Sequence, residues 1–219
     1  MELYDVMRTT GAVRRFTDEP LPDEVLVRIL DNARFAPSGG NRQGTRVIVV
    51  RDRTTRKAIV DLSVTGAQRY LAQTKNGEGP WNPLQPMKVS PEEVAATAVP
   101  PYLGAPVLTA GAVLVVCVDL NVCAAFDQHL DRIGVIPGAS VYPFVWNILL
   151  AARNEGYGGV LTTMAVAEEP RVKELLGIPD DYAIAALLPI GKPVKQVKKL
   201  TRKPVSEFAT KERFDGTLL

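Results

Sequence analysis

The sequence predicts a single α+β domain. Helical and strand patterns follow one another without the regular alternation that a doubly wound parallel sheet requires, and the sequence contains no internal repeat. A chain of 219 residues with 46% apolar side chains is long enough to bury one sizeable core. We therefore expect one domain over residues 1–219, with a variable, lid-like excursion at about 64–105 and a basic C-terminal tail at about 192–219.

The first half of the chain contains signals for two helices. A short helix is expected over residues 1–10, with Leu3, Val6 and Met7 on one side. A second helix is expected to begin at Pro22, because Asp23 and Glu24 follow in its first turn and apolar residues recur at helical spacing as far as Ala33. The second helix is expected to stop at the turn of residues 36–40.

A strand and a third helix come next. Residues 46–51 have the density of β-branched side chains that is typical of a buried strand. Asp52 is placed to cap a helix over about 54–62. From 64 to 105 no period is sustained, and prolines and glycines surround Trp81, Met87 and Tyr102. A loop of this length is often a lid or the wall of a pocket, and the alternative is a segment that packs against a partner subunit.

The second half contains the most apolar elements. Residues 113–119 and 183–190 are expected to form buried strands, and 160–163 the end of another strand. Residues 140–152 are apolar on nearly every helical face, so this helix must be covered both by its own sheet and by a second subunit. A short helix is expected from Pro170 to Leu176, where Gly177 stops it.

Composition excludes several classes of protein. The chain has 26 Lys and Arg against 24 Asp and Glu without a clustered basic stripe, which argues against a nucleic-acid partner. Its longest apolar run, residues 105–118, is shorter than the roughly 20 residues of a membrane-spanning helix, so we expect no membrane partner. The first residues lack the basic and apolar regions of a secretory signal, which predicts a cytoplasmic protein.

Residues for metal or histidine chemistry are scarce. Cys117 and Cys123 lack metal-ligand spacing, and His129 is the only histidine, so we expect no metal site. His129 could act with Asp127 or Asp131, but a solvated helix face explains these residues more simply.

Three polar clusters remain, in the turn 10–15, the loop 38–43 and the tail at 202–203. The guanidinium and ammonium groups of the first and third clusters could bind a phosphate, although solvated surface charges would have the same pattern. The Gly-Gly pair of the loop allows a close backbone approach to a flat ligand, or simply ends a helix. Neither a dinucleotide-binding glycine motif nor a phosphate-binding loop is present.

The order and spacing of these segments are informative. The features, in chain order, are Val13-Arg14-Arg15-Phe16, Pro20-Leu21-Pro22, Ala36-Pro37-Ser38-Gly39-Gly40-Asn41-Arg42-Gln43, Trp146-Asn147-Ile148-Leu149-Leu150-Ala151-Ala152, Gly156-Tyr157-Gly158-Gly159 and Leu188-Pro189-Ile190-Gly191-Lys192-Pro193. In this order they resemble the nitroreductase family of flavin mononucleotide (FMN) enzymes. The resemblance covers the chain apart from about 64–105.

The resemblance implies a three-layer fold in which helices flank a central, mostly antiparallel sheet, and an intertwined homodimer with FMN at the interface. It implies that Thr162 and Thr163 offer backbone donors near flavin N5, and that Arg14 lies near the N1/O2 edge. The FMN-binding residues implied are Thr10, Gly11, Ala12, Arg14, Arg15, Pro37, Ser38, Gly39, Asn41, Thr162, Thr163, Arg202 and Lys203.

The implied reaction is hydride transfer from NADH or NADPH through the flavin to a small aromatic acceptor such as a nitroaromatic or a quinone. No catalytic side chain is required, because flavin N5 carries the hydride. Trp81 and Tyr102 are the expected substrate contacts. Family members often have arginine at the positions of Thr10 and Gly11. Either Arg15, Arg202 and Lys203 compensate, or FMN is held less tightly, or another flavin-like cofactor is used.

Three alternative functions are compatible with the same resemblance to different degrees. A flavin-destroying branch has Asp where this chain has Ala12, which argues against that activity. A dehalogenase branch binds a zwitterionic amino acid with charged lid residues, for which this chain offers Lys75, Glu78 and Lys88 beside Trp81. A flavin or deazaflavin storage protein is the third alternative.

Overall fold

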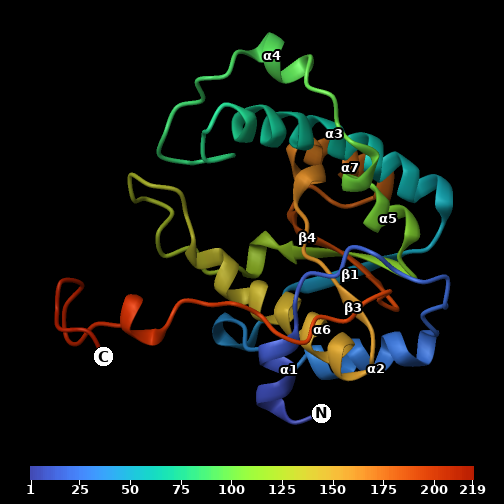
Figure 1. The fold of residues 1–219 in the computed structure, drawn as a ribbon, viewed down its shortest axis with the longest axis horizontal. Helices are drawn as coiled ribbons and strands as arrows, with labels where there is room; N and C mark the ends of the chain where they lie inside the picture. The colour runs from blue at the N-terminus through green and yellow to red at the C-terminus, as the bar shows by residue number, and fades with distance from the viewer.

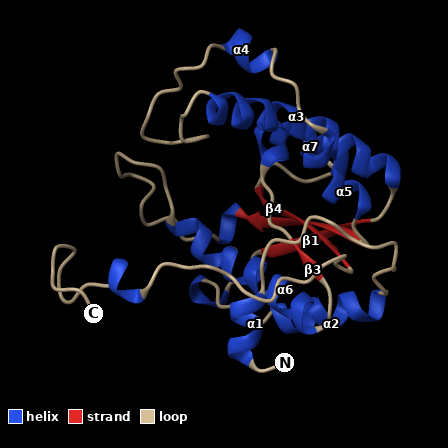
Figure 2. Ribbon diagram, viewed as in Figure 1, coloured by secondary structure: helices blue, strands red, loops and turns tan.

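The computed structural model describes all residues 1–219, and its centre is a four-stranded antiparallel sheet in the order β1-β2-β4-β3. The strands are β1 (Thr45–Val50), β2 (Ala112–Asp119), β3 (Gly158–Gly159) and β4 (Tyr182–Gly191). Helices cover both faces of the sheet (Figure 1, Figure 2). The α+β class and the three layers expected from the sequence are therefore confirmed.

The central strand β2 explains why both faces are covered. Successive strand residues point to opposite faces of a sheet. Leu114 and Val116 contribute to one buried apolar cluster, whereas Val113 and Val115 contribute to the other. Since all four are almost completely buried, each face of the sheet needs its own helical layer.

One layer contains α1 (Leu3–Thr9), α2 (Asp23–Ala33) and α6 (Tyr142–Asn154). The apolar face of α2 packs as expected, with Leu26 and Ile29 buried. In α1, Val6 is buried whereas Leu3 and Met7 are exposed within one chain.

The other layer contains α3 (Arg53–Lys75), α5 (Ala105–Thr109) and α7 (Glu169–Leu176), and α4 (Pro91–Ala95) lies beyond α3 (Figure 1). Gly177 ends α7 with a φ of 63°, as expected. Asp52 caps α3 as predicted, since its side chain accepts a 2.7 Å hydrogen bond from the N–H of Thr55.

The predicted end of that helix at residue 62 is wrong, because α3 continues to Lys75 through the first part of the expected loop. Its second half buries small and polar side chains, namely Gly66, Ala67, Ala72 and Gln73. A buried face without large apolar residues produces no visible hydrophobic period.

The environment of β1 also differs from expectation. It is an edge strand that pairs with β2 alone, and Val49 is 41% exposed. Its β-branched composition predicted the strand correctly but not its burial, because β-branched residues favour half-buried strands as well.

The helix α6 is only partly covered within one chain. Phe144 and Ile148 are buried against the sheet, but Tyr142 and Trp146 are 46% and 43% exposed. The tail after Lys192 first runs along the turn 10–15, where the N–H of Val194 donates a 3.0 Å hydrogen bond to the Arg15 carbonyl, and its last part extends away from the body of the molecule (Figure 1). Complete burial of α6 would therefore require a surface from outside the chain.

Candidate active site

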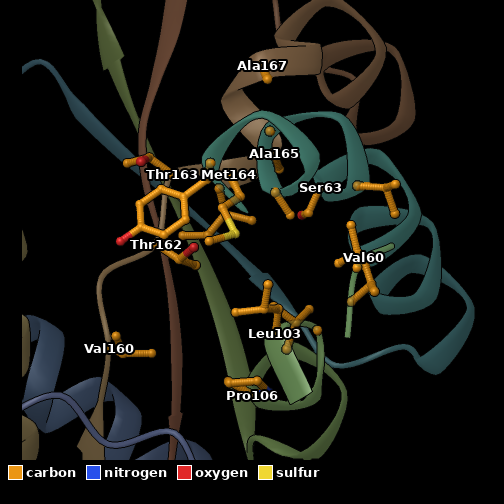
Figure 3. A pocket seen from close by; sticks show the side chains of 18 of the residues that line it. Val60, Ser63, Leu103, Pro106, Val160, Thr162, Thr163, Met164, Ala165 and Ala167 are labelled. Carbon is orange, nitrogen blue, oxygen red and sulfur yellow. The ribbon is translucent and has the colours of Figure 1, made fainter. Parts of the chain in front are cut away.

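A cavity of about 740 Å³ lies between the helical layer of α3 and α5 and the end of the sheet. Most of its lining is apolar. Figure 3 shows Val60 and Ser63 of α3 facing Thr162, Thr163 and Met164 across the cavity. Leu103 and Pro106 line another part of its wall (Figure 3).

Five of the residues expected from the sequence meet at this cavity: Arg14, Trp81, Tyr102, Thr162 and Thr163. They come from four separate parts of the chain. The structure therefore joins the first polar cluster, the excursion and the segment after β3 into one site.

The segment after β3 presents its backbone to the cavity. Thr162 and Leu187 exchange two 2.9 Å backbone hydrogen bonds, so this threonine is an extension of the sheet. The expectation that both threonines offer backbone donors is wrong for Thr162, whose N–H donates to the Leu187 carbonyl. The N–H of Thr163 has no acceptor within the chain and is available to a ligand.

Arg14 is the one charged side chain in the cavity lining. Its position is set by Val13, which is buried and donates a 2.9 Å backbone hydrogen bond to the carbonyl of Gly159 in β3. No carboxylate forms an ion pair with Arg14. An anion in the cavity would thus meet a cation whose charge is not already neutralised.

Trp81 forms the outer wall. Its indole Nε1–H donates a 3.3 Å hydrogen bond to the carbonyl of Gly66, and the Arg69 guanidinium lies 3.9 Å from the centre of its ring. Sequence reasoning found Trp81 but missed Arg69, Ser63 and Gln73, because the extension of α3 that carries them was not predicted.

The rest of the turn 10–15 lies outside the cavity lining, so the structure does not bring Thr10, Gly11, Ala12 and Arg15 to it. Thr10 is buried and its hydroxyl donates a 2.7 Å bond to the Val6 carbonyl. A side chain at Gly11 would begin 3.0 Å from Leu200 of the tail. The absence of arginine at these positions thus matches a turn that is covered by the tail.

Arg202 and Lys203 lie on the exposed tail and do not reach the cavity in this chain. Arg202 donates to the neighbouring Thr201 carbonyl, and Lys203 lies 3.8 Å from Glu207. Within one chain, neither side chain lies where it could contact a phosphate group of a ligand in the cavity.

The loop 37–41 lies at a different hollow. Pro37 and Ser38 line a second cavity of about 450 Å³ between α2, β1 and α6, whereas Gly39 and Asn41 line neither cavity. The Ser38 hydroxyl accepts a 2.9 Å hydrogen bond from Gln43, whose φ is 51°. Asn41 also has a positive φ, of 54°, which non-glycine residues rarely adopt. Such strained loops cluster at ligand sites.

The histidine alternative is not supported. His129 lies in an exposed turn instead of the expected helix face. Asp127 is buried, and Arg132, Val135 and Ile136 donate hydrogen bonds to one of its oxygens. These bonds, the one from Val135 first, lower the pKa of Asp127 to about 2. Asp127 therefore stabilises its own loop.

Two further observations concern the whole chain. No group of three or more His, Cys, Asp or Glu side chains is arranged to hold a metal ion. No helix has both the length and the hydropathy needed to cross a membrane.

Comparison with known proteins identifies the family. The sequence profile described as the Nitroreductase family matches residues 7–192. The chain belongs to the nitroreductase family. An iodotyrosine deiodinase of Nematostella vectensis is 30% identical over 210 residues, which are 94% of this chain and 74% of the relative.

Solved structures agree with this assignment. Iodotyrosine deiodinase bound to FMN and 3-iodo-L-tyrosine aligns with a TM-score of 0.67 and 23% identity, covering 93% of this chain and 96% of that chain. NADPH:FMN oxidoreductase from Vibrio harveyi, complexed with NAD+, aligns with a TM-score of 0.67 and 19% identity, covering 97% and 77%. At these identities the two structures establish the nitroreductase fold of this chain.

Proposed function

We propose that this protein is an FMN-dependent oxidoreductase that transfers a hydride from NADH or NADPH to an electron-poor aromatic acceptor such as a nitroaromatic or a quinone. The observation that carries the proposal is the meeting of Arg14 and the free Thr163 N–H with Trp81 and Tyr102 around one largely apolar cavity. Its volume of about 740 Å³ is in the range of small-molecule sites.

The residues present fit a flavin. When bound, FMN would supply the hydride chemistry. Arg14 would stabilise negative charge on the reduced ring, because a cation at the wall of a mostly apolar cavity interacts with charge that develops beside it. Thr163 would donate its backbone N–H to a ring atom, while the apolar side chains of Val60 and Leu103 would exclude water from the ring.

We also propose that a second copy of the chain completes the site. Ser38 lines a separate hollow, and Arg202 lies on a tail that extends away from the body. Tyr142 and Trp146 leave part of α6 uncovered. A homodimer would cover this face and supply the phosphate contacts from Arg202 and Lys203, and the ring contacts from Ser38, Gly39 and Asn41, that one chain does not bring to its cavity.

Dehalogenation of an amino acid is the second candidate, favoured by the deiodinase relative. A zwitterion needs both a carboxylate and a cation at its site. No acidic side chain lines the cavity, and Lys75, Glu78 and Lys88 are all outside its lining. The lining therefore supports an uncharged aromatic acceptor over a zwitterion.

The experiment compares both reactions on the purified protein loaded with FMN. NADH or NADPH oxidation is followed with menadione, with nitrobenzene and with 3-iodotyrosine as acceptors. Turnover with the first two and little with the third is expected. Arg14→Ala should lower turnover, whereas Arg53→Ala, an exposed arginine at the start of α3, is a matched control. Iodide release as the main activity would contradict the proposal, and flavin binding without any turnover would indicate a storage protein.

A further inference from the structure

The segment between α3 and α4, residues 76–90, is tied to α3 by two polar side chains. Glu78 accepts four hydrogen bonds, from the side chains of Asn76 and Gln73 and from the backbone N–H groups of Lys88 and Val89. The bond from Asn76 is the largest of the effects that lower the pKa of Glu78 to about 2. One carboxylate thus joins the two ends of the segment.

Gln73 connects this carboxylate to the cavity wall. The Gln73 side chain is 2% exposed, and its Nε2 donates a 3.1 Å hydrogen bond to Glu78. Its Oε1 accepts from the backbone N–H of Trp81 at 2.9 Å and from Nε of Arg69 at 3.2 Å. Arg69 in turn lies over the indole ring.

The backbone conformation of Trp81 is one that this residue does not prefer on its own. Its φ is 55°, in the left-handed region that residues with large side chains rarely adopt. Trp81 is nonetheless held at two points: its backbone N–H donates to Gln73, and its indole Nε1–H donates to the Gly66 carbonyl. Gly66 adjoins Met164, the residue after Thr163. The wall is therefore linked to the same backbone that presents the free N–H.

We propose that Gln73, anchored by Glu78, is a positioning residue that presets Trp81 as a fixed wall of the cavity and thereby determines which planar acceptors stack there. By this proposal the wall is built before the acceptor arrives, in place of a lid that orders on binding. The inference deepens the proposed function and rests on it for the identity of the acceptor. An aromatic wall held in place favours planar molecules that can stack on it, because a preset surface requires no further ordering when they bind.

The test uses Gln73→Leu, which removes the amide, and Gln73→Glu, which keeps its size and the acceptor for Trp81 but places a second carboxylate beside Glu78. Gln85→Leu is the matched control, because Gln85 is an exposed amide on the same segment. Trypsin cleavage after Lys88 reports release of the segment, because proteolysis follows the population of the open state. Both Gln73 variants should be cleaved about tenfold faster than the wild type and Gln85→Leu.

The kinetic measurements distinguish an effect on the Trp81 wall from an effect on the flavin. With FMN loaded, KM for menadione should rise about 3- to 10-fold in both Gln73 variants. The kcat with ferricyanide, which cannot stack on an indole, should stay within about twofold of wild type. Menadione binding, followed by quenching of tryptophan emission with Trp81→Phe as the reference, should weaken by the same factor as KM rises.

Three results would overturn the proposal: wild-type cleavage in both variants, faster cleavage with unchanged menadione affinity, or an effect of Gln73→Leu that Gln73→Glu does not share. The last would mean that the acceptor for the Trp81 N–H, which Gln73→Glu keeps, positions Trp81 without the anchor from Glu78. Cleavage and menadione binding need no turnover. If NAD(P)H oxidation fails for every protein, the proposed function is wrong, while these two measurements still decide the role of Gln73.

Discussion

Gly66 lies where α3 meets the segment after Thr163, and its replacement by alanine tests the contact that shapes the site. A Cβ at this position would lie 2.3 Å from the carbonyl oxygen of Met164 and 3.0 Å from its carbonyl carbon. Cβ contacts in proteins essentially never fall below 3.0 Å, so α3 and the Met164 backbone must move apart. We expect Gly66→Ala to destabilise the protein and to displace Thr163.

Two opposing effects determine the magnitude. Alanine in place of glycine within a helix favours folding by about 1 kcal/mol. Overpacking a tight contact costs about 1–3 kcal/mol, and the upper part of this range applies because the obstacle is backbone. The net destabilisation is therefore about 1–2 kcal/mol, which lowers the melting temperature of a protein of this size by about 2–8 °C.

The assay is a melting curve combined with an FMN titration. Thr65→Ala serves as control, because Thr65 is an exposed neighbour on α3 and its replacement adds no contact. Gly66→Ala should melt below both the wild type and Thr65→Ala, and should bind FMN more weakly. A Gly66→Ala variant that melts no lower than Thr65→Ala and binds FMN with wild-type affinity would refute the reasoning.

Three further predictions concern the cofactor and the wall. Arg14→Ala is expected to weaken FMN binding about 10- to 100-fold, because a hydrogen bond to a charged group contributes about 1.5–3 kcal/mol; equal affinities in a fluorescence titration would contradict this. Arg202→Ala should weaken FMN binding to a similar extent in the dimer but riboflavin binding far less, since riboflavin lacks the phosphate; equal losses would point to an effect on folding. Glu78 has a pKa of about 2 in the folded protein against an ordinary 4.5, so its contribution to stability is complete above about pH 4.5 and is lost as the pH falls toward 2. Melting temperatures measured from pH 5 to pH 2.5 should therefore fall less steeply for Glu78→Gln than for the wild type, and parallel curves would argue against this role.

Some elements were predictable because their signals are local. The apolar runs of β2 and β4, the cap at Asp52 and the stop at Gly177 each depend on a few neighbouring residues. The same is true of the motifs that resemble the nitroreductase family, since short combinations such as Pro37-Ser38-Gly39 are read directly from the sequence. The length of α3 was not predictable in this way. The buried face of its second half consists of Gly66, Ala67, Ala72 and Gln73, which pack against backbone and polar partners instead of a large apolar core.

The expected site residues also fall into two groups. The sequence predicted site roles for Arg14, Trp81, Tyr102, Thr162 and Thr163, and the structure brings all five to one cavity. The remaining expected residues do not line that cavity within one chain.

By itself, the sequence determined the α+β class, the elements with strong local patterns and the family to which the chain belongs. Only the tertiary structure decided which of the two threonine N–H groups is free and which contacts hold Trp81. Thr162 donates its N–H to Leu187, 25 residues later, and the polar tie from Glu78 through Gln73 to Trp81 depends on the path of the loop. Hydrogen bonds between distant segments depend on where the folded chain places each group, and a local sequence pattern carries no record of that placement.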